Sequence, residues 1–261
     1  MLTRLVQPAL TEDELFAALH PELNRWFRGR FTHFAPAQCI AVPEILAGRS
    51  LLLSSPTGSG KTLAAFLGVF DFLAKARDAG ALPAGIVAVY VSPLRALAYD
   101  LRKNLQQPLD ELGWDWLRVG ARTGDTTPKD RAQQKRKPPH ILVTTPESLT
   151  LLLSQPGWLA PFRATRFLIA DEMHALAENK RGTMLTLAAE RLEEVSNAKC
   201  QVPNVSQDKA AKNSALGTRH STLTRIGLSA TVAPLETVAE FLVGPGRPCR
   251  IARQYSGRDC R

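Results

Sequence analysis

The sequence predicts an α/β fold in which a doubly wound, mostly parallel sheet carries helices on both faces. First, short and largely apolar runs recur along the chain, at residues 51–54, 86–91, 140–143, 167–170 and 225–228. Such runs are typical of strands that are buried on both faces, as in parallel sheets. Second, each run is followed by a stretch of helix length, and right-handed βαβ crossovers then build an open sheet covered on both sides.

The helical stretches follow in chain order. Residues 61–75 carry apolar side chains at helical spacing, among them Leu63, Phe66 and Phe70. Further helices are expected at residues 94–112, 147–153, 173–195 and 235–243. We expect residues 1–30 to form a helical lead-in, residues 31–250 the main domain and residues 251–261 a tail.

One segment breaks this rhythm. Residues 196–222 are rich in Asn, Ser, Lys and Gln, with few large apolar side chains and no periodicity. Such a composition is typical of a mobile insertion, here between a helix and the last expected strand. The segment is mildly basic, and a solvated loop explains it better than a dedicated binding arm.

The composition is that of a soluble protein with a basic excess. The 261 residues include 44% hydrophobic and 22% charged residues, with a formal net charge of +9. A basic excess suits a polyanionic partner such as nucleic acid, or an anionic membrane surface. The four cysteines are scattered, which argues against a zinc site or a disulfide framework. No signal peptide or membrane-spanning run is recognisable, so we expect a cytoplasmic protein.

The strongest motif is SPTGSGKT at residues 55–62, between an expected strand and an expected helix. Its glycines let the backbone wrap closely around phosphate oxygens, which the N–H groups and the helix dipole attract. Lys61 offers a positive charge to the β- and γ-phosphates of ATP, and Thr62 offers a hydroxyl to magnesium. The alternative is a Gly-rich turn with an accidental lysine. The residues expected to bind the nucleotide are Thr57, Gly58, Ser59, Gly60, Lys61 and Thr62.

The second motif is FLIADEMH at residues 167–174, a hydrophobic strand that ends in two carboxylates. Both emerge at the carboxyl edge of the sheet, where Lys61 also lies. Asp171 can hold the magnesium through water, and Glu172 can orient or deprotonate the attacking water. We therefore expect Lys61, Asp171 and Glu172 to be catalytic, with Thr62 and Asp171 on the metal. His174 either relays the nucleotide state or is structural.

In this order the motifs resemble those of superfamily 2 helicases of the DEAD/DEXH-box type. Residues 55–62 resemble motif I, whose usual first residue in that family is Ala, which accounts for Ser55 where the general phosphate-loop pattern has Gly. Residues 171–174 resemble the DEXH form of motif II. The resemblance runs from about residue 26 to residue 243 and implies a RecA-like P-loop NTPase lobe.

Two more motifs resemble family elements around the nucleotide. FAPAQ at residues 34–38 resembles a Q-motif, whose glutamine, Gln38 here, reads the adenine edge. SAT at residues 229–231 resembles motif III, which couples ATP hydrolysis to strand movement. The resemblance thus implies a coupling role for His174, Ser229 and Thr231.

Three further motifs resemble strand-contacting elements of the same helicases: SPLRAL at residues 92–97, TGD at residues 123–125 and TTPES at residues 144–148. Each follows a strand end or starts a helix, so together they could form one rim along the top of the sheet. Backbone N–H groups, hydroxyls and basic side chains are the usual holders of nucleic-acid phosphates. The residues expected to contact nucleic acid are Pro93, Arg95, Arg122, Thr123, Gly124, Thr145 and Pro146.

Within that family the residues of several motifs most resemble those of the large helicase-related proteins, whose bacterial relatives include the ligase-associated DEXH-box helicases. The resemblance implies an ATP-dependent nucleic-acid helicase or translocase, with DNA as the expected partner and a link to repair. Motors of this family close ATP between two lobes, and the second lobe supplies arginines that can contribute on the order of 10³–10⁵ in rate. We find no second-lobe motif after residue 243. We therefore expect weak hydrolysis by this lobe alone, and a second lobe as its partner in a longer protein.

Two other functions stay open. A lone lobe could bind ATP and nucleic acid as a module without unwinding. A small-molecule phosphotransferase on the same loop is more remote, because it needs an acceptor-binding lid and leaves the strand-contacting motifs without a purpose. The sequence does not decide between DNA and RNA or give a direction of translocation.

Overall fold

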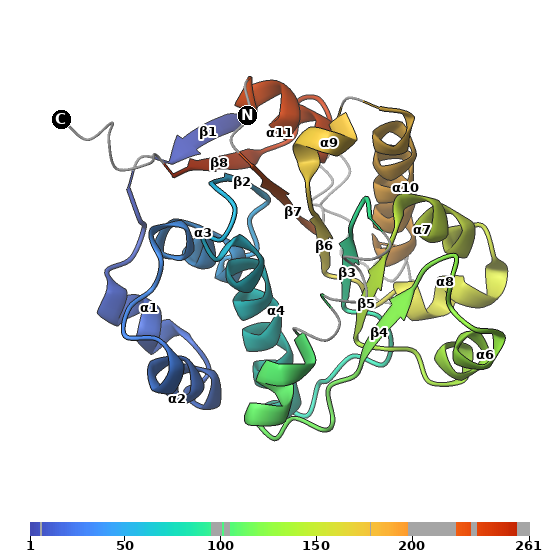
Figure 1. The fold of residues 1–261 in the computed structure, drawn as a ribbon, viewed down its shortest axis with the longest axis horizontal. Helices are drawn as coiled ribbons and strands as arrows, with labels where there is room; N and C mark the ends of the chain where they lie inside the picture. The colour runs from blue at the N-terminus through green and yellow to red at the C-terminus, as the bar shows by residue number, and fades with distance from the viewer. Residues whose placement is uncertain are drawn as a thin grey trace, which may run out of the picture.

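A single parallel sheet organises the chain. The computed structural model describes residues 1–5, 7–94, 101, 105–177, 179–197, 223–230 and 234–254. Within them, eight strands lie in the order β1-β8-β2-β7-β6-β3-β5-β4, and every pairing is parallel (Figure 1). The strands are β1 (Leu2–Leu5), β2 (Leu51–Ser54), β3 (Ala88–Val91), β4 (Val119–Arg122), β5 (Ile141–Thr144), β6 (Phe167–Ala170), β7 (Thr224–Ser229) and β8 (Cys249–Arg253).

Helices cover both faces of this sheet. They are α1 (Glu12–Ala18), α2 (Pro21–Arg30), α3 (Pro36–Leu46), α4 (Lys61–Asp78), α6 (Pro128–Arg136), α7 (Pro146–Leu153), α8 (Pro156–Phe162), α9 (Met173–Ala177), α10 (Lys180–Asn197) and α11 (Leu235–Val243), and residues 105–111 are also helical. The predicted α/β fold is confirmed. Among the described helices, none has the length and apolar character needed to cross a membrane.

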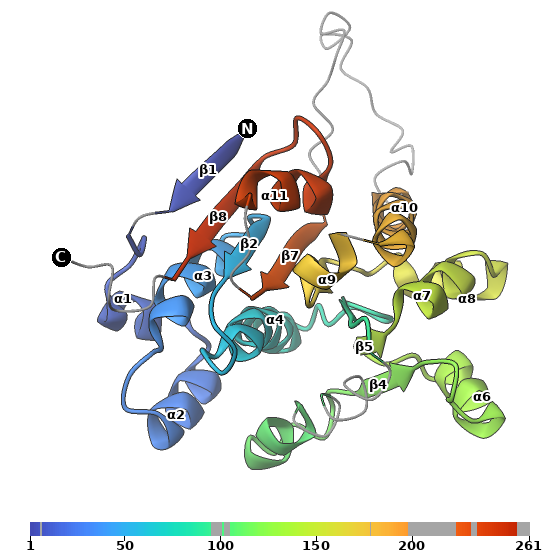
Figure 2. The ribbon, with the colours of Figure 1, turned by 45° about the horizontal axis from the view of Figure 1, so that its top comes forward.

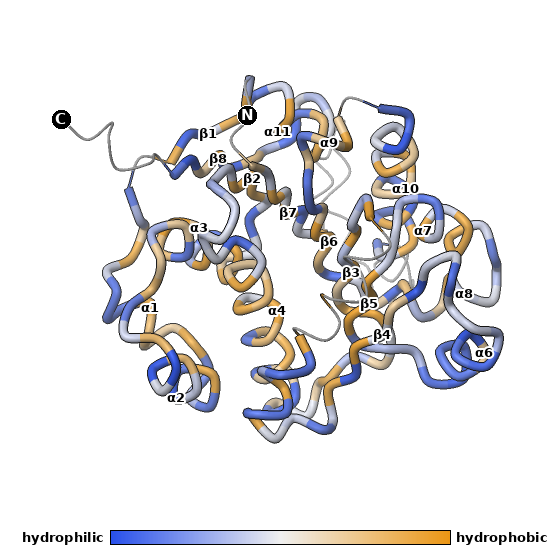
Figure 3. Tube along the Cα trace, in the orientation of Figure 1, coloured by the Kyte–Doolittle hydropathy of each residue, from blue (hydrophilic) through white to orange (hydrophobic). Residues whose placement is uncertain are grey.

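Two hydrophobic cores, one on each face, hold the sheet between the helices. Alternate residues of β2 divide between them: Leu51 and Leu53 pack in one cluster with residues of α1 to α4, and Leu52 packs in the other with residues of α7 to α11. All three are buried, and burying one leucine side chain contributes roughly 1.5–3 kcal/mol. Figures 1 and 2 show the two helix groups on opposite sides of the strands, and Figure 3 shows apolar residues concentrated in the central strands and α4.

Two helix starts follow directly from their sequences. Gly60, with a φ of 83°, is the N-cap of α4, which therefore begins immediately after the phosphate-type loop. At α7 the side chain of Thr145 accepts a hydrogen bond from the N–H of Ser148, at 3.4 Å, and Pro146 fills the first helical position. Both devices are usual at helix N-termini. They fix where the two helices begin relative to the ends of β2 and β5.

The structure corrects several expected elements. Strand β1 opens the lead-in at residues 1–30, which is therefore not wholly helical, although α1 and α2 fill most of the remainder. Strand β8 carries the sheet three residues into the expected tail, and β4 was not expected at all. The helix expected at 173–195 is two helices, α9 and α10. The expected insertion begins within α10, and residues 198–222 lie outside the described residues.

Candidate nucleotide and nucleic-acid site

The motif-bearing strands end side by side at one edge of the sheet. The registers place Ser54 beside Ser229, and Val91 beside both Ala170 and Thr144. Since all the strands are parallel, their carboxyl ends face the same way, where α/β proteins place their ligands. The expected nucleotide and coupling motifs follow β2, β7 and β6, and the expected strand-contacting motifs follow β3, β5 and β4. One half of this sheet edge therefore carries the motifs expected to bind the nucleotide, and the other half carries the motifs expected to contact nucleic acid.

The loop at residues 55–62 has the backbone that a phosphate cradle requires. Gly58 and Gly60 have φ values of 79° and 83°, a left-handed conformation that costs glycine little. Ser55 is anchored to the sheet, because its N–H donates to the Ser229 carbonyl at 3.1 Å. The Ser55 hydroxyl is hydrogen-bonded to Ser59 and, at 3.0 Å, to the side chain of Gln254, the residue after β8. The loop is thus held at the carboxyl end of β2 and leads directly into the N-terminus of α4.

Gln38 of α3 contacts this loop through its side-chain amide. Its amide oxygen accepts the N–H of Ala35 at 2.9 Å, and its amide nitrogen donates to the Gly60 carbonyl at 3.4 Å. A Cβ at position 60 would lie 2.6 Å from the amide nitrogen of Gln38, so only glycine fits there without movement. The structure therefore places Gln38 against the nucleotide loop, while its recognition of adenine stays a prediction.

Lys61 and the two carboxylates after β6 lie close enough to interact. Burial lowers the pKa of the Lys61 ammonium, and the negative charges of Glu172 and Asp171 oppose that shift. The ammonium donates to the carbonyls of Ser55 and Pro56, the latter at 3.1 Å. The three residues expected to be catalytic are thus brought together.

Glu172 has a backbone that non-glycine residues rarely adopt, with a φ of 51°. Its carbonyl starts α9 by accepting the N–H of Ala175 at 2.8 Å. Its carboxylate lies 3.2 Å from Nε2 of His174, and Nδ1 of that ring lies 3.3 Å from the Ser229 hydroxyl. A continuous polar path therefore joins the acidic strand end to the end of β7, and the coupling role of His174 and Ser229 stays a prediction. Thr231 lies outside the described residues.

Sequence reasoning missed Tyr90, which belongs to this group. It lies on β3, it is 2% exposed, and its hydroxyl donates to the Asp171 carboxylate and interacts with the Thr62 side chain. Burial, followed by the charge of Asp171, raises the pKa of the Tyr90 hydroxyl, which therefore stays protonated and able to donate. In the sequence Tyr90 is one more apolar residue in a strand, and only its phenolic oxygen could have signalled a polar neighbour.

The oxygen donors here fit a hard divalent cation. The carboxylate of Asp171 accepts the Tyr90 hydroxyl, with which the Thr62 side chain also interacts, so the Asp171 and Thr62 oxygens lie near each other. Mg²⁺ prefers a few protein oxygens of this kind, together with water and phosphate oxygens. Thr62 and Asp171 are accordingly the residues that would hold it.

The other half of the edge carries Arg122, a buried guanidinium at the end of β4. The residue is 9% exposed, and its Nη1 has no hydrogen-bond partner among the described residues. It lies 5.4 Å from the ring centroid of Trp158, and burial followed by the charge of Arg131 lowers the pKa of Arg122. A buried cation with an unused donor is costly unless it meets an anion. Among the residues expected to contact nucleic acid, Arg122 is therefore the one whose burial most clearly calls for an anionic partner.

The remaining strand-contacting residues follow β4 and the two strands next to it in the sheet. The hydroxyl of Thr144 donates to the Arg122 carbonyl at 2.7 Å, so the residues that follow β4 and β5 are neighbours. The exposure of these residues differs. Gly124 is exposed, and those with buried side chains are Pro93, Thr123, Thr145 and Pro146. Arg95 lies outside the described residues.

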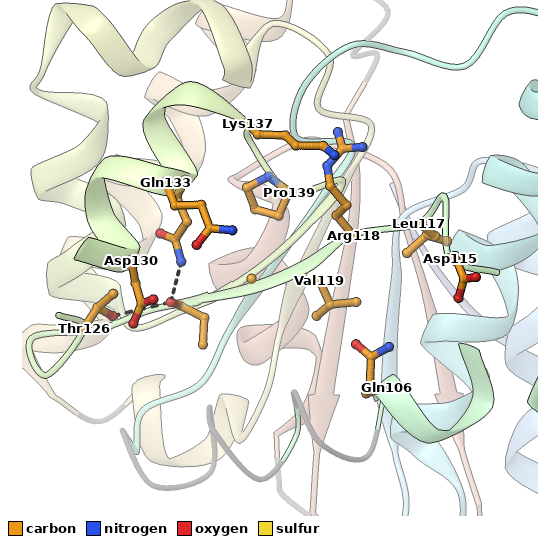
Figure 4. A pocket seen from close by; sticks show the side chains of 13 residues that line it. Gln106, Asp115, Leu117, Arg118, Val119, Thr126, Asp130, Gln133, Lys137 and Pro139 are labelled. Carbon is orange, nitrogen blue, oxygen red and sulfur yellow. Dashed lines mark hydrogen bonds between the residues drawn. The ribbon is translucent and has the colours of Figure 1, made fainter. Parts of the chain in front are cut away.

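A separate cavity of about 330 Å³ lies along the outer edge of β4, between the helix at residues 105–111 and α6 (Figure 4). Its lining includes Gln106, Asp115, Arg118 and Asp130, and none of its lining residues belongs to the loop at 55–62 or to the acidic end of β6. The amide nitrogen of Gln134 reaches the Ala121 carbonyl from this side at 2.9 Å. The residues expected to bind the nucleotide therefore lie outside this cavity.

The family profile and the similar proteins of known sequence all indicate the same family. The profile described as DEAD/DEAH box helicase matches residues 35–241. The chain is 43% identical over 242 residues to the ATP-dependent helicase Lhr-Core of Methanothermobacter thermautotrophicus, which covers 90% of this chain and 25% of that protein. It is 40% identical over 239 residues to the Lhr helicase/probable uracil glycosylase of Mycolicibacterium smegmatis, covering 88% of this chain and 14% of that protein. The chain thus spans about a quarter or less of these relatives.

Solved structures agree. The Mycobacterium smegmatis helicase Lhr bound to ssDNA and AMP-PNP superposes with a TM-score of 0.76 at 35% identity, over 93% of this chain and 29% of that one. The DEAD-box helicase Mss116 bound to ssRNA and UDP-BeF superposes with a TM-score of 0.77 at 20% identity, over 98% of this chain and 47% of that one, which shows the shared fold alone.

Proposed function

The chain belongs to the DEAD/DEAH box helicase family, and from that premise we propose that it is the ATP-binding lobe of an ATP-dependent DNA helicase or translocase with a role in DNA repair. The observation that carries the proposal is the arrangement of one sheet edge. The nucleotide motifs and the strand-contacting motifs end on neighbouring strands, with β6 and β3 at the junction. Binding events in the two halves can therefore influence each other through directly paired strands.

Each residue of the nucleotide half has a definite task in ATP hydrolysis. The backbone of the loop and Lys61 hold the phosphates, and Thr62 and Asp171 would hold Mg²⁺, which would supply positive charge against the developing negative charge. Glu172 orients the attacking water and accepts its proton, which is general base catalysis. The contacts from Glu172 through His174 to Ser229 then carry the state of the nucleotide toward the neighbouring strand.

The strand-contacting half is proposed to bind single-stranded DNA through its phosphates. The buried, partly unpartnered guanidinium of Arg122 supports an anionic ligand, and the N-terminus of α7 beside it adds backbone N–H groups. The preference for DNA is supported by the 35% identical neighbour, which was solved with ssDNA.

We further propose that a second lobe completes the ATP cleft. The matched relatives are much longer than this chain, which covers about 25% of the first of them. An arginine supplied from a second lobe stabilises charge on the transferred phosphoryl group and can contribute on the order of 10³–10⁵ in rate. Hydrolysis by this lobe alone should therefore be slow, although ATP and DNA should both bind.

The test is the ATPase rate, with and without single-stranded DNA, of this chain and of Glu172→Gln. Loss of a general base lowers a rate by about 10²–10⁴, while the uncharged Gln should leave nucleotide binding intact. DNA-stimulated hydrolysis that Glu172→Gln abolishes supports the enzymatic assignment. Binding of both ligands with hydrolysis near background in both proteins means that hydrolysis requires the second lobe, and failure to bind ATP refutes the proposal.

A further inference from the structure

Tyr90 occupies the junction between the two halves of the edge. It lies on β3, which pairs with β6 on one side and with β5 on the other. Its ring is stacked on Phe66 of α4, with ring centroids 5.5 Å apart and an interplanar angle of 24°. The side chain is therefore clamped between the sheet and the helix that begins at Lys61, and its hydroxyl has a fixed position.

That hydroxyl faces groups from two different elements. It donates to the Asp171 carboxylate at the end of β6, and it also interacts with the Thr62 side chain in the first turn of α4. A phenolic hydroxyl has one proton to donate and lone pairs to accept with, so the two interactions are compatible. The ring packing alone would be equally satisfied by phenylalanine. Only the hydroxyl supplies the hydrogen bond to Asp171.

The second oxygen of Asp171 is also held. Its Oδ1 accepts the N–H of Glu172 at 2.9 Å, while Oδ2 accepts the Tyr90 hydroxyl. A carboxylate fixed at both oxygens cannot rotate freely, and partners of this kind tune the affinity of metal ligands.

We propose that Tyr90 is a positioning residue for the magnesium of the nucleotide complex, which sets the direction of the Asp171 carboxylate. The proposal rests on the proposed function, because it concerns the same site. It predicts an effect on binding of the metal complex that a purely structural tyrosine would not have.

The test measures binding of a fluorescent ATP analogue as free Mg²⁺ is titrated, in wild type and Tyr90→Phe. Phenylalanine keeps the ring on Phe66 and deletes only the hydroxyl. The Mg²⁺ concentration at half-saturation should rise about 10-fold, the lower end of the range that removing a metal ligand's hydrogen-bonded partner produces. Affinity for the analogue in EDTA should stay unchanged.

Trp114→Phe is the matched control. Trp114 lies in the same hydrophobic cluster, and its indole N–H donates to Glu22 at 2.6 Å, away from the nucleotide loop. This variant also deletes a hydrogen-bond donor from an aromatic residue, so it should lower the melting temperature without moving the Mg²⁺ titration. If Tyr90→Phe behaves like Trp114→Phe, the tyrosine is structural and the positioning role is overturned, while the proposed function stands. If wild type itself does not bind the Mg²⁺ complex, the proposed function fails and this inference fails with it.

Discussion

Glu172 combines a strained backbone with a proposed catalytic role that needs a fixed side-chain direction. Its φ of 51° lies in the left-handed region, which costs a residue with a Cβ roughly 1–2 kcal/mol. The cost is offset locally, because its carbonyl begins α9 and its carboxylate meets His174 at 3.2 Å. Strain that the surroundings hold in place is common where a catalytic side chain must point one way. Here it turns Glu172 away from the line of β6 while Asp171 continues it.

His140, just before β5, should make the fold sensitive to acid. It is buried, and burial followed by the charges of Arg118 and Lys137 lowers its pKa to about 4. An unfolded histidine titrates near 6.5, so between those values the unfolded chain binds a proton that the folded chain does not. Stability is therefore unaffected above pH 6.5 and falls as the pH drops toward 4, by at most about 3 kcal/mol in total.

Urea denaturation between pH 7.5 and pH 4.5 measures this effect. His140→Gln cannot titrate, so the difference in unfolding free energy between wild type and variant should shrink as the pH falls. A difference that stays constant over this range would show that the folded protein accepts the proton at position 140 without penalty.

At the scale of elements, a partly buried charge network centred on Arg225 joins β7 to α10, and Arg225 also donates to carbonyls at the end of α11. Arg225 of β7 has a side chain that is 3% exposed, and it pairs with Glu193 and, at 2.9 Å, with Glu190. Arg247 pairs with the same two glutamates at 3.2 and 2.6 Å. Burial raises the pKa of Glu190, but hydrogen bonds from Arg247 and Arg225 outweigh it and lower the pKa overall. The network fixes α10 against the strand that ends at Ser229.

Arg225→Met should therefore destabilise the protein by about 3–5 kcal/mol, because it leaves a carboxylate buried without its main partner. Arg4→Met is the control, since the Arg4–Glu236 pair is 68% and 40% exposed and such pairs contribute about 0–1 kcal/mol. Chemical denaturation of both variants gives the comparison. An equally small destabilisation in both would mean that the Arg225 network is solvated and contributes little.

The elements that sequence reasoning found and missed differ in burial. Strands β2, β5 and β6 are buried at every position, which produces the continuous apolar runs that predict them. The edge strands β1 and β4 need no such run, because one side has no partner strand, and β8 interrupts its apolar residues with Arg250. Helix α6 has no buried residue and so carries no apolar periodicity. The local sequence pattern therefore predicts the buried strands, whereas the edge strands and the exposed helix become visible only in the three-dimensional structure.

For the site, the sequence predicted the residues whose chemistry a short motif displays. The loop at 55–62 and the pair Asp171 and Glu172 lie together as expected. Tyr90 could not be predicted, because its role depends on the pairing of β3 with β6 and on the packing of α4. The orphaned donor of Arg122 likewise follows from burial beside Trp158, far away in the sequence.

For the whole molecule, the net charge of +9 raises the question of which cations bind nucleic acid and which only attract it. When one cation no longer binds a phosphate of a single strand, the plot of log K against log salt becomes shallower by about 0.7, whereas distant exposed charges are screened. Arg122→Gln should therefore weaken binding of single-stranded DNA and reduce that slope by about 0.7. Lys135→Gln, on exposed α6, should leave the slope unchanged.

Fluorescence anisotropy of a labelled oligonucleotide, measured from low to moderate salt, gives both slopes. A thermal melt of Arg122→Gln is needed beside it, because the guanidinium also packs against Trp158. If the slope falls only with Lys135→Gln, the DNA runs over α6 and the rim after β4 and β5 is not its path. If it falls only with Arg122→Gln, the strand follows the sheet edge directly beside the ATP-binding half, which is the arrangement that coupling between the two halves requires.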